Sequence, residues 1–435
     1  MSKRIVLSAF GSFGDVHPYI ALARELKARG HRPVIATSEM YREKMDAAGV
    51  ELFPVRPDDL PSYDEPERMS ELVEKMVHPR TGIDEIFKRM ILPYVRASYD
   101  DITAAVGGAD LLVTHPLPFV GPVVAEKTGV AWASSILAPA SLLSHYDPPV
   151  FPQLGPLNRF VGLHPLVMAA LMRAGRWVMR DIERAINRLR AEEGLGPSPG
   201  HPFMEAQYSP RLNLALFSKV LASPQRDWPA NTRVTGFPFY DRRDYFGETE
   251  TVPELLEFLD AGPPPVVFTL GSAAFWAAKD FYTESIKAAR SLGRRALLLV
   301  GHKNYRPPDA SSPDVAAFEY APFGEVLPRA AAVVHHGGVG TTGQALRSGR
   351  PQLVMPFSHD QFDNGGRAAR LGAARVLPRP KYNARSAERE LGALLNDQSY
   401  AARAAEVGEI VRNENGAVSA CDLIEREMFG IERPT

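Results

Sequence analysis

Glycine, histidine and threonine are concentrated in one short segment late in the chain. Residues 331–364 run AAVVHHGGVGTTGQALRSGRPQLVMPFSHDQFDN. The apolar run 331–334 predicts a buried strand, and Gly338, Gly340 and Thr341 after it predict a turn that opens into a helix. A helix that starts in a glycine turn offers free backbone N–H groups and the positive end of its dipole to an anion. The segment therefore predicts a phosphate-binding loop.

Polar side chains stand at both ends of this loop. His336 can donate a hydrogen bond to a phosphate oxygen, and Thr341 adds a hydroxyl group. After a second apolar run come His359, Asp360 and Gln361, whose side chains can bond to sugar hydroxyls. Hydrogen-bond donors for a phosphate, next to groups that bind hydroxyls, suggest a site for a nucleotide sugar.

A second segment, Gly11 to Pro18, carries groups that could move a proton. It runs GSFGDVHP and follows the first predicted strand, and doubly wound sheets place their sites at the ends of such strands. Asp15 and His17 are the two candidates for a general base. Asp15 could instead be an acid that caps the first turn of a helix. On this motif alone, both roles for Asp15 remain open.

The late segment also fits another kind of site. Gly338 to Gly343 spell G-x-G-x-x-G after a strand, and Asp360 follows about 20 residues later, as in a dinucleotide-binding fold. A crossover helix in such a fold needs more than the roughly seven residues between Gly343 and Pro351. An NAD-dependent oxidoreductase is therefore kept only as an alternative.

The late segment resembles the donor-binding signature of glycosyltransferase family 1. That signature has a His-x-Gly core, a Gly-x-Pro and a final Asp-Gln, which correspond here to 336–338, 349–351 and 360–361. Gln344 stands where many members have a Glu that bonds the ribose hydroxyls, and an amide can still donate and accept there. At the first loop, many bacterial members have Gly-Asp-x-x-Pro, which places Asp15 at the position of the base and leaves His17 as the fallback.

The resemblance implies an α/β fold of the GT-B type, with two facing Rossmann-like domains, parallel sheets and an interdomain cleft. The domains would be 1–237 for the acceptor and 265–414 for the nucleotide sugar, with 238–264 as linker and a C-terminal helix, about 415–435, packing back on the first. The implied donor-binding residues are Gly14, Gly271, Ser272, Tyr320, Pro322, His336, Gly338, Gly340, Thr341, Thr342, Gln344, Asp360 and Gln361. Tyr320 would stack on the base, where the family has a Trp, and Ser272 would reach the diphosphate.

More narrowly, the chain looks like the bacterial rhamnosyltransferases of rhamnolipid synthesis. The similar segments are 11–18, 141–144 with 148–150, 225–229, 235–238 and 351–364. The expected function is an inverting, metal-independent glycosyltransferase that uses a UDP- or dTDP-linked sugar, with dTDP-rhamnose as one option, and an apolar acceptor bearing a hydroxyl. No Asp-x-Asp pair occurs in the sequence, and no cofactor is expected beyond the nucleotide sugar as co-substrate. A catalytically silent nucleotide-sugar-binding auxiliary protein is the other alternative.

The elements that must position these loops follow from hydrophobic patterning. Strands are expected at 5–9, 33–37, 51–55, 111–114 and 131–135, and after a Gly-Pro-Pro-Pro break at 266–270, 295–300, 315–319 and 331–334. Helices are expected between them at 19–29, 41–48, 121–128 and 281–292, with a last helix at 419–428. Strands that alternate with helices predict parallel sheets, and 435 residues are enough for two domains.

Composition narrows the list of partners. The net charge of -1 gives no field that would recruit nucleic acid, and one cysteine, Cys421, allows no internal disulfide, as in the reducing cytoplasm. The first ten residues resemble a signal peptide, but Gly11 and Asp15 interrupt the pattern, and a buried strand is expected instead. The apolar tract 111–143 is broken by charges and prolines and does not predict a membrane span.

Apolar residues in the first half suggest where an acceptor would bind. The tract 130–143 follows a predicted strand, and 145–180 adds Tyr146, Phe151, Leu166, Met168, Leu171, Met172 and Trp177. A long helical pattern, Leu166 to Glu193, has one apolar and one cationic face. It fits an acceptor-site wall, a weak association with a membrane surface, or a helix packed on its own domain.

Overall fold

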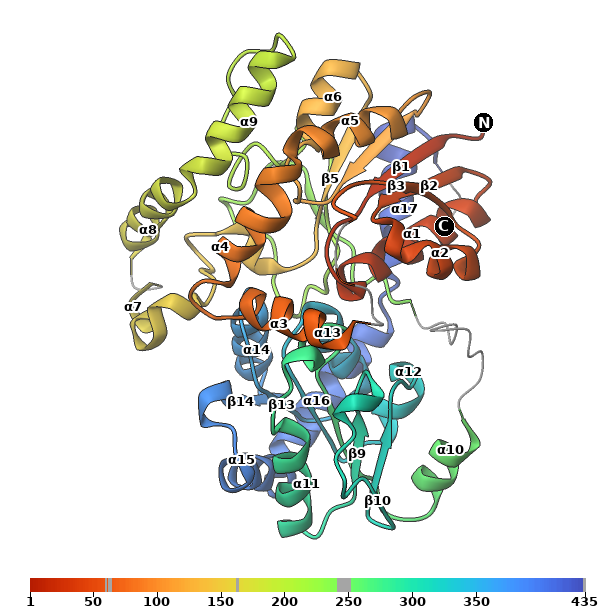
Figure 1. Cartoon of the computed structure of the whole chain (residues 1–435), viewed down its shortest axis with the longest axis vertical. Helices are drawn as coiled ribbons and strands as arrows, with labels where there is room; N and C mark the ends of the chain where they lie inside the picture. The colour runs from red at the N-terminus through yellow and green to blue at the C-terminus, as the bar shows by residue number, and fades with distance from the viewer. Residues whose placement is uncertain (59–60, 62–64, 162–163, 241–251, 433–435) are drawn as a thin grey trace.

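A computed structural model describes residues 1–58, 61, 65–161, 164–240 and 252–432 of the chain. Two sheets form two halves, one above the other in Figure 1, and each sheet is covered by helices. This is the GT-B fold expected from the sequence. Asp241, Arg242, Arg243 and Asp244, the polar patch of the expected linker, lie outside the described residues.

The first sheet has seven parallel strands in the order β3-β2-β1-β4-β5-β6-β7. The strands are β1 (Arg4–Ser8), β2 (Arg32–Thr37), β3 (Glu51–Pro54), β4 (Leu111–Thr114), β5 (Trp132–Ile136), β6 (Asn213–Ala215) and β7 (Thr232–Val234). The helices of this half are α1 (Phe13–Ala28), α2 (Arg42–Ala48), α3 (Pro66–Met76), α4 (Gly82–Ile86), α5 (Val95–Ala105), α6 (Gly121–Thr128), α7 (Asn158–Val161), α8 (Pro165–Val178) and α9 (Arg180–Glu192). The central strands are buried on both faces, which explains their continuous apolar runs.

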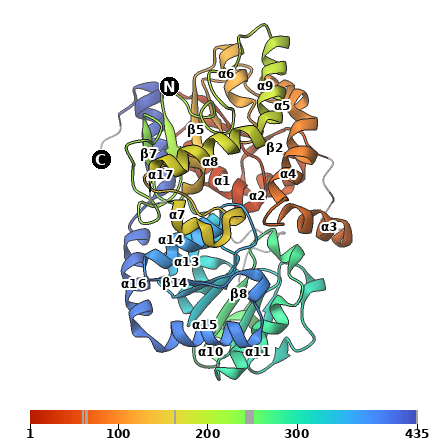
Figure 2. The ribbon, with the colours of Figure 1, turned by 90° about the vertical axis from the view of Figure 1, so that its left-hand side faces the viewer.

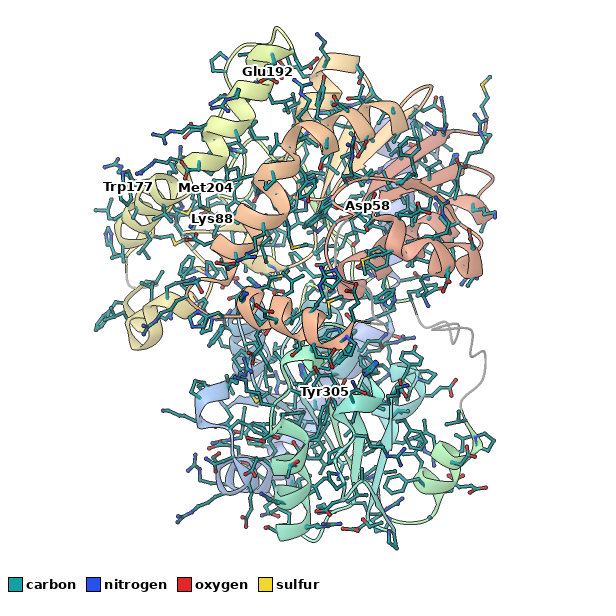
Figure 3. All side chains as sticks on the ribbon, viewed as in Figure 1. Asp58, Lys88, Trp177, Glu192, Met204 and Tyr305 are labelled. Carbon is teal, nitrogen blue, oxygen red and sulfur yellow. The ribbon has the colours of Figure 1, made fainter. Side chains whose placement is uncertain are left out.

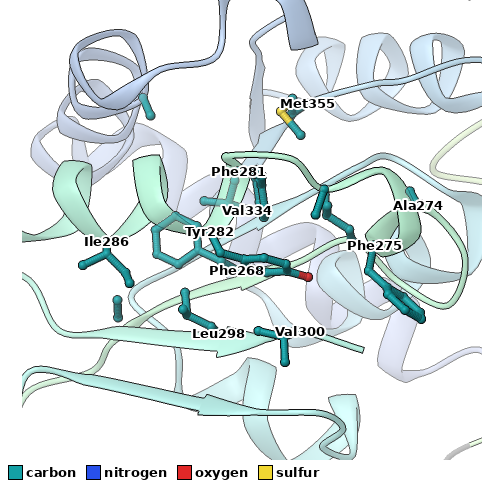
Figure 4. Packing of buried hydrophobic residues seen from close by; sticks show 14 of the residues in the cluster. Phe268, Ala274, Phe275, Phe281, Tyr282, Ile286, Leu298, Val300, Val334 and Met355 are labelled. Carbon is teal, nitrogen blue, oxygen red and sulfur yellow. The ribbon is translucent and has the colours of Figure 1, made fainter. Parts of the chain in front are cut away.

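The second sheet has the order β10-β11-β9-β8-β12-β13-β14, and its edge strand β10 runs antiparallel to β11. The strands are β8 (Val266–Thr269), β9 (Ala296–Leu299), β10 (Ser311–Ser312), β11 (Val315–Phe318), β12 (Ala332–His335), β13 (Gln352–Val354) and β14 (Ala374–Val376). The helices are α10 (Pro253–Asp260), α11 (Phe281–Ser291), α12 (Phe323–Val326), α13 (Val339–Ser348), α14 (Gln361–Arg370), α15 (Ala384–Asn396) and α16 (Gln398–Arg412). Phe268, Tyr282 and Leu298 pack between this sheet and α11 (Figure 4).

The last helix, α17 (Gly416–Leu423), leaves the second half and lies beside the first sheet in both ribbon views (Figures 1 and 2). Cys421 and Ile424 are fully buried in the same cluster as Leu22 and Leu26 of α1. The carboxylate of Glu425 accepts from Arg29 at 2.7 Å and pairs with His31 at 2.8 Å. Apolar burial and buried ionic contacts thus tie the C-terminal segment to the first half.

Helix α3 extends the other way across the molecule. Met69, Val73 and Val77 belong to the buried cluster of the second sheet, together with Trp276. The hydroxyl of Ser70 donates to the carbonyl of Trp276 at 2.7 Å. A segment of the first half thus fills part of the second half's core, a contact that no sequence pattern indicated.

The predicted helix from Leu166 to Glu193 is wrong as a single element. The chain breaks at Met179 into α8 and α9. Ile182 and Ile186 of α9 pack in the core, whereas Leu166 of α8 is 71% exposed. None of the helices in the described part of the chain has the length and apolarity needed to cross a bilayer.

Candidate functional site

A cavity of about 170 Å³ lies between the two halves, at the ends of both sheets. The first half contributes the loop after β1, and the second half contributes the loops after β8, β11 and β12. The expected site residues that line it are Gly14, His17, Gly271, Ser272, Tyr320, Pro322, Gly340, Thr341 and Gln344. The structure therefore brings together loops that lie more than 300 residues apart in the sequence.

Asp15 is held by the loop that contains it. Its carboxylate oxygen Oδ2 accepts from the backbone N–H of Ser12 at 2.8 Å and from the Ser12 hydroxyl at 3.1 Å. These contacts form a capping box at the start of α1. Gly11 has a φ of +120°, and a side chain there would come within 2.3 Å of Oδ2 of Asp15. The capping interpretation of Asp15 is thus confirmed, and it fixes the carboxyl group in one position.

Burial raises the pKa of Asp15 to about 6, although its bonds from Ser12 act in the opposite direction. Asp360, on the other half, has a pKa raised to about 7 by burial, and the charge of Asp15 raises it further. The two carboxyl groups therefore interact across the space between the loops. A carboxylate with a pKa near the working pH is suited to accept a proton.

The imidazole ring of His336 is enclosed by two glycines. A side chain on Gly271, whose φ is +66°, would lie 2.4 Å from Cε1 of the ring, and one on Gly338 would lie 2.4 Å from Nε2. Thr341 lies on the same side, since its Oγ1 would be 3.2 Å from a side chain at Gly271. Only glycine at positions 271 and 338 leaves room for the ring. This explains why the loops on both sides of the ring carry glycine there.

His336 is neutral near pH 7, because burial and then the neighbouring His335 lower its pKa to about 3. Its Nδ1 is buried and has no hydrogen-bond partner among the described residues. His335, in contrast, pairs with Gln352 at 3.0 Å and accepts from the Gly337 N–H at 3.1 Å. His335 therefore supports the loop, while His336 can bind a ligand.

Helix α13 begins directly after this ring, with Gly338 at its N-cap. No acidic side chain is present in its first turn, so the positive end of its dipole remains available to an anion. Gly14 of the first half approaches this end: a side chain on Gly340 would lie 3.9 Å from the Gly14 carbonyl, and one on Gly14 would lie 3.9 Å from Oγ of Ser272. The loops of the two halves thus face each other at the N-terminus of α13.

The three polar residues before α14 have different roles from one another. The Oε1 atom of Gln361 accepts from the Phe357 N–H at 2.9 Å, which leaves the NH₂ group for a sugar hydroxyl. Asp360 accepts from Asn364 at 2.7 Å. His359 has a φ of +54°, and its ring hydrogen-bonds to the carbonyl of Met76. Burial lowers the pKa of the ring, and this hydrogen bond acts in the opposite direction. The ring of His359 thus contacts the first half through one of its nitrogens.

Aromatic residues that the sequence analysis did not select form the cavity wall. Phe237, Phe239 and Tyr240 come from the segment after β7, and Phe275 comes from the second half. The apolar residues 145–180 do not line this cavity, and only Leu137 of the tract 130–143 does so. Phe237 lies in a segment noted for its resemblance, but its sequence gives no sign that it faces the site.

Six of the expected site residues are not among those that line the cavity: Asp15, His336, Gly338, Thr342, Asp360 and Gln361. Thr342 is fully buried, and its backbone N–H donates to the carbonyl of Gly338 at 2.8 Å, so it supports the helix. Tyr320 is half-buried at the cavity wall, where its ring is accessible to a stacked base. Within the described residues, no three His, Cys, Asp or Glu side chains converge as metal ligands would.

Two family models match the chain. Residues 5–134 match the model described as "Glycosyltransferase family 28 N-terminal domain", and residues 298–419 match "Erythromycin biosynthesis protein CIII-like, C-terminal domain". O-mycaminosyltylonolide 6-deoxyallosyltransferase of Streptomyces fradiae is 34% identical, over 97% of this chain and 97% of that protein. Sterol 3-beta-glucosyltransferase of Debaryomyces hansenii is 28% identical over 98% of this chain, which spans only 27% of that longer protein.

Solved structures share the fold. CalG4, the calicheamicin glycosyltransferase, superposes with a TM-score of 0.68 at 20% identity and covers 100% of both chains. The spinosyn rhamnosyltransferase SpnG, complexed with thymidine diphosphate, superposes with a TM-score of 0.63 at 17% identity and covers 97% of this chain and 100% of its own.

Replacing His336 by Ala should weaken the binding of a nucleoside diphosphate. A hydrogen bond to a charged group contributes about 1.5–3 kcal/mol, which corresponds to a roughly tenfold to 150-fold rise in Kd. Titration calorimetry with dTDP and UDP measures this change. His335→Ala is the contrasting variant: it should lower the melting temperature because it removes two buried hydrogen bonds. Unchanged diphosphate affinity in His336→Ala would disprove the assignment.

Proposed function

Because this chain belongs to the GT-B glycosyltransferases of families 1 and 28, we propose that it moves a sugar from a nucleoside diphosphate to a hydroxyl of an apolar acceptor. The observation that carries the proposal is the approach of the loop that contains Asp15 to the donor loop: Gly14 lies beside Ser272 and the first turn of α13, and the charge of Asp15 acts on Asp360 of the other half. Family membership replaces both alternatives, the NAD-dependent oxidoreductase and the silent auxiliary protein. The proposed division into 1–237, 238–264 and 265–414, with the last helix on the first half, follows the same assignment.

In the proposed reaction, the carboxylate of Asp15 takes the proton from the acceptor hydroxyl. The acceptor oxygen attacks the anomeric carbon, and the bond from that carbon to the diphosphate oxygen breaks with its electron pair. Attack opposite the leaving group inverts the anomeric centre. His336 and the N-terminus of α13 would stabilise the departing diphosphate without a metal.

The donor is proposed to be linked to dTDP or UDP. Bound thymidine diphosphate in SpnG supports dTDP, and the name of that relative makes dTDP-rhamnose one donor to test. Tyr320 at the cavity wall would stack on the base, and Gln344 would bond the ribose. Asp360 and the NH₂ group of Gln361 would bind the sugar. Buried, unpaired Cys421 agrees with the cytoplasmic location that is part of this proposal.

The acceptor is proposed to be a largely apolar small molecule or lipid. The aromatic wall of Phe237, Phe239 and Tyr240 supports this class, since apolar burial contributes about 25 cal/mol per Å². The relatives named above act on a macrolide intermediate, O-mycaminosyltylonolide, and on sterols. Trp177 of α8, 67% exposed at the outer edge in Figure 3, lies under Arg180 at 4.6 Å and supports a weak contact with a membrane surface.

Asp15→Asn should reduce turnover by roughly 100-fold or more, because the amide keeps the bonds from Ser12 but cannot take a proton. The affinity for dTDP should not change. Turnover of the unmodified protein, measured with excess chelator, should fall as the pH drops through about 6, since the base form of Asp15 is lost below that pKa. The residual activity of the variant should lack this dependence.

His17→Asn is the matched control, because His17 lies two residues from Asp15 and lines the cavity. It should retain most of the turnover. Near-normal turnover in Asp15→Asn together with an inactive His17→Asn would transfer the role of base to His17. A complete loss of turnover with chelator, restored by Mg²⁺ or Mn²⁺, would contradict the metal-independent reaction.

A panel of acceptors tests the apolar pocket. Phenols, sterols, macrolides and hydroxy fatty acids should accept the sugar, whereas free sugars should not. Phe239→Ser should raise the KM of the apolar acceptors and leave the donor KM unchanged, since Phe239 lines the cavity on the first half's side. Transfer to free sugars alone would show the acceptor assignment to be wrong while leaving the donor site intact.

A further inference from the structure

Helix α14 connects the donor loop with the segment that follows β5 in the first half. Its first turn faces the donor loop: the Asn364 side chain donates to the carbonyl of Gly337 at 2.9 Å and to Asp360 at 2.7 Å. Asp363, also in the first turn, and Arg367, one turn later, are 0% and 2% exposed. One short helix thus touches the sugar-binding turn and, behind it, a buried pair of charges.

That buried pair reaches the first half of the molecule. Arg367 bonds to Asp363 at 2.6 Å, to the carboxylate of Asp147, to the carbonyl of Asp147 at 3.3 Å and to the carbonyl of Leu221 at 3.2 Å. The other carboxylate oxygen of Asp363 accepts from the backbone N–H of Val150 at 3.1 Å. All of these contacts except the bond within the pair cross from the second half to residues 147–221.

The segment 144–150 is also fixed from its own side. Asp227 accepts from the Ser144 hydroxyl at 2.7 Å and from the His145 N–H at 2.6 Å. Arg226 stacks on the ring of Tyr146 at 3.8 Å. The segment therefore has one defined position relative to the first sheet, and α14 sets its position relative to the donor loop.

A buried ion pair is costly to desolvate and contributes little net stability, but its directional bonds permit only one arrangement of the groups around it. Here those groups lie on the two halves of the molecule. The guanidinium is planar and bonds in fixed directions, so a small shift of the segment 144–150 would break several bonds at once. Such contacts define geometry more than they add stability.

We propose that Asp147, Asp363 and Arg367 are positioning residues, which hold the segment 144–150, and with it the first half that carries the acceptor, in register with the donor loop. This inference rests on the proposed function. None of the three residues lines the cavity, so they act through Asn364 and the backbone rather than on the substrate. When the acceptor is out of register, water reaches the anomeric carbon in its place. The donor is then hydrolysed to free sugar and nucleoside diphosphate, and the water proton passes to the base.

The test compares Asp147→Asn with Glu74→Gln. Glu74 pairs with Lys279 at 2.8 Å across the same two halves but touches neither α14 nor 144–150, and this pair is exposed. Asp147 is 25% exposed at its side chain, and Arg367 keeps Asp363 in the variant, so the fold should survive. If a lower melting temperature shows that Asp147→Asn disturbs the fold, Arg370→Gln serves as the second variant. It removes the 3.3 Å contact with the Asp147 carboxylate and should give smaller effects of the same kind.

We expect two results for Asp147→Asn. Amide hydrogen exchange of 144–150 should accelerate at least tenfold, and the ratio of donor hydrolysis to acceptor transfer should rise about fivefold or more with the dTDP affinity unchanged. Glu74→Gln should change neither. Equal effects in both variants, or faster exchange with an unchanged ratio, would overturn the positioning role. Hydrogen exchange does not depend on activity, so an inactive parent protein would contradict the proposed function alone.

Discussion

The structure depends on the absence of side chains at the meeting point of the two halves. The ring of His336 occupies the space beside Gly271 and Gly338, and the backbone of Gly14 comes close to Ser272 and to Gly340 in the first turn of α13. A Cβ at Gly271 or Gly338 would overlap with the ring. This close approach puts an unpaired imidazole nitrogen, a helix N-terminus and the loop of Asp15 around one small space, and the proposed chemistry requires all three.

Contacts between the halves are distributed around that space. Helix α3 adds apolar side chains to the core of the second half, the segment after α17 binds Arg29 and His31, and α14 holds Asp147. Most of these contacts bury polar or charged groups and so specify direction as well as proximity. The arrangement favours a fixed relation between acceptor and donor loops, as a displacement at one carbon atom demands.

The sequence predicted much of the sheet architecture, because buried parallel strands are continuous apolar runs with recognisable helices between them. Strand β6 was not predicted: it has three residues, and its Asn213 is buried through bonds to Ser209 and Ala230 that no local pattern indicates. The glycine loop and Asp15 were found because turns and caps are local features. Asp147 and Arg367 are separated by 220 positions, so their pairing depends on the tertiary fold alone. The contact of His359 with Met76 could not be predicted for the same reason, since Met76 lies on the other half.

Histidine ring signals measured by NMR during a titration with dTDP test the central claim most directly. If the diphosphate binds between the two loops, the ring signals of His336 should shift along with saturation, and its pKa should rise because an anion replaces an apolar neighbourhood. The ring of His335, bonded to Gln352, should move far less. If dTDP binds while the His336 signals stay unchanged, the diphosphate lies elsewhere and the account of the site is wrong.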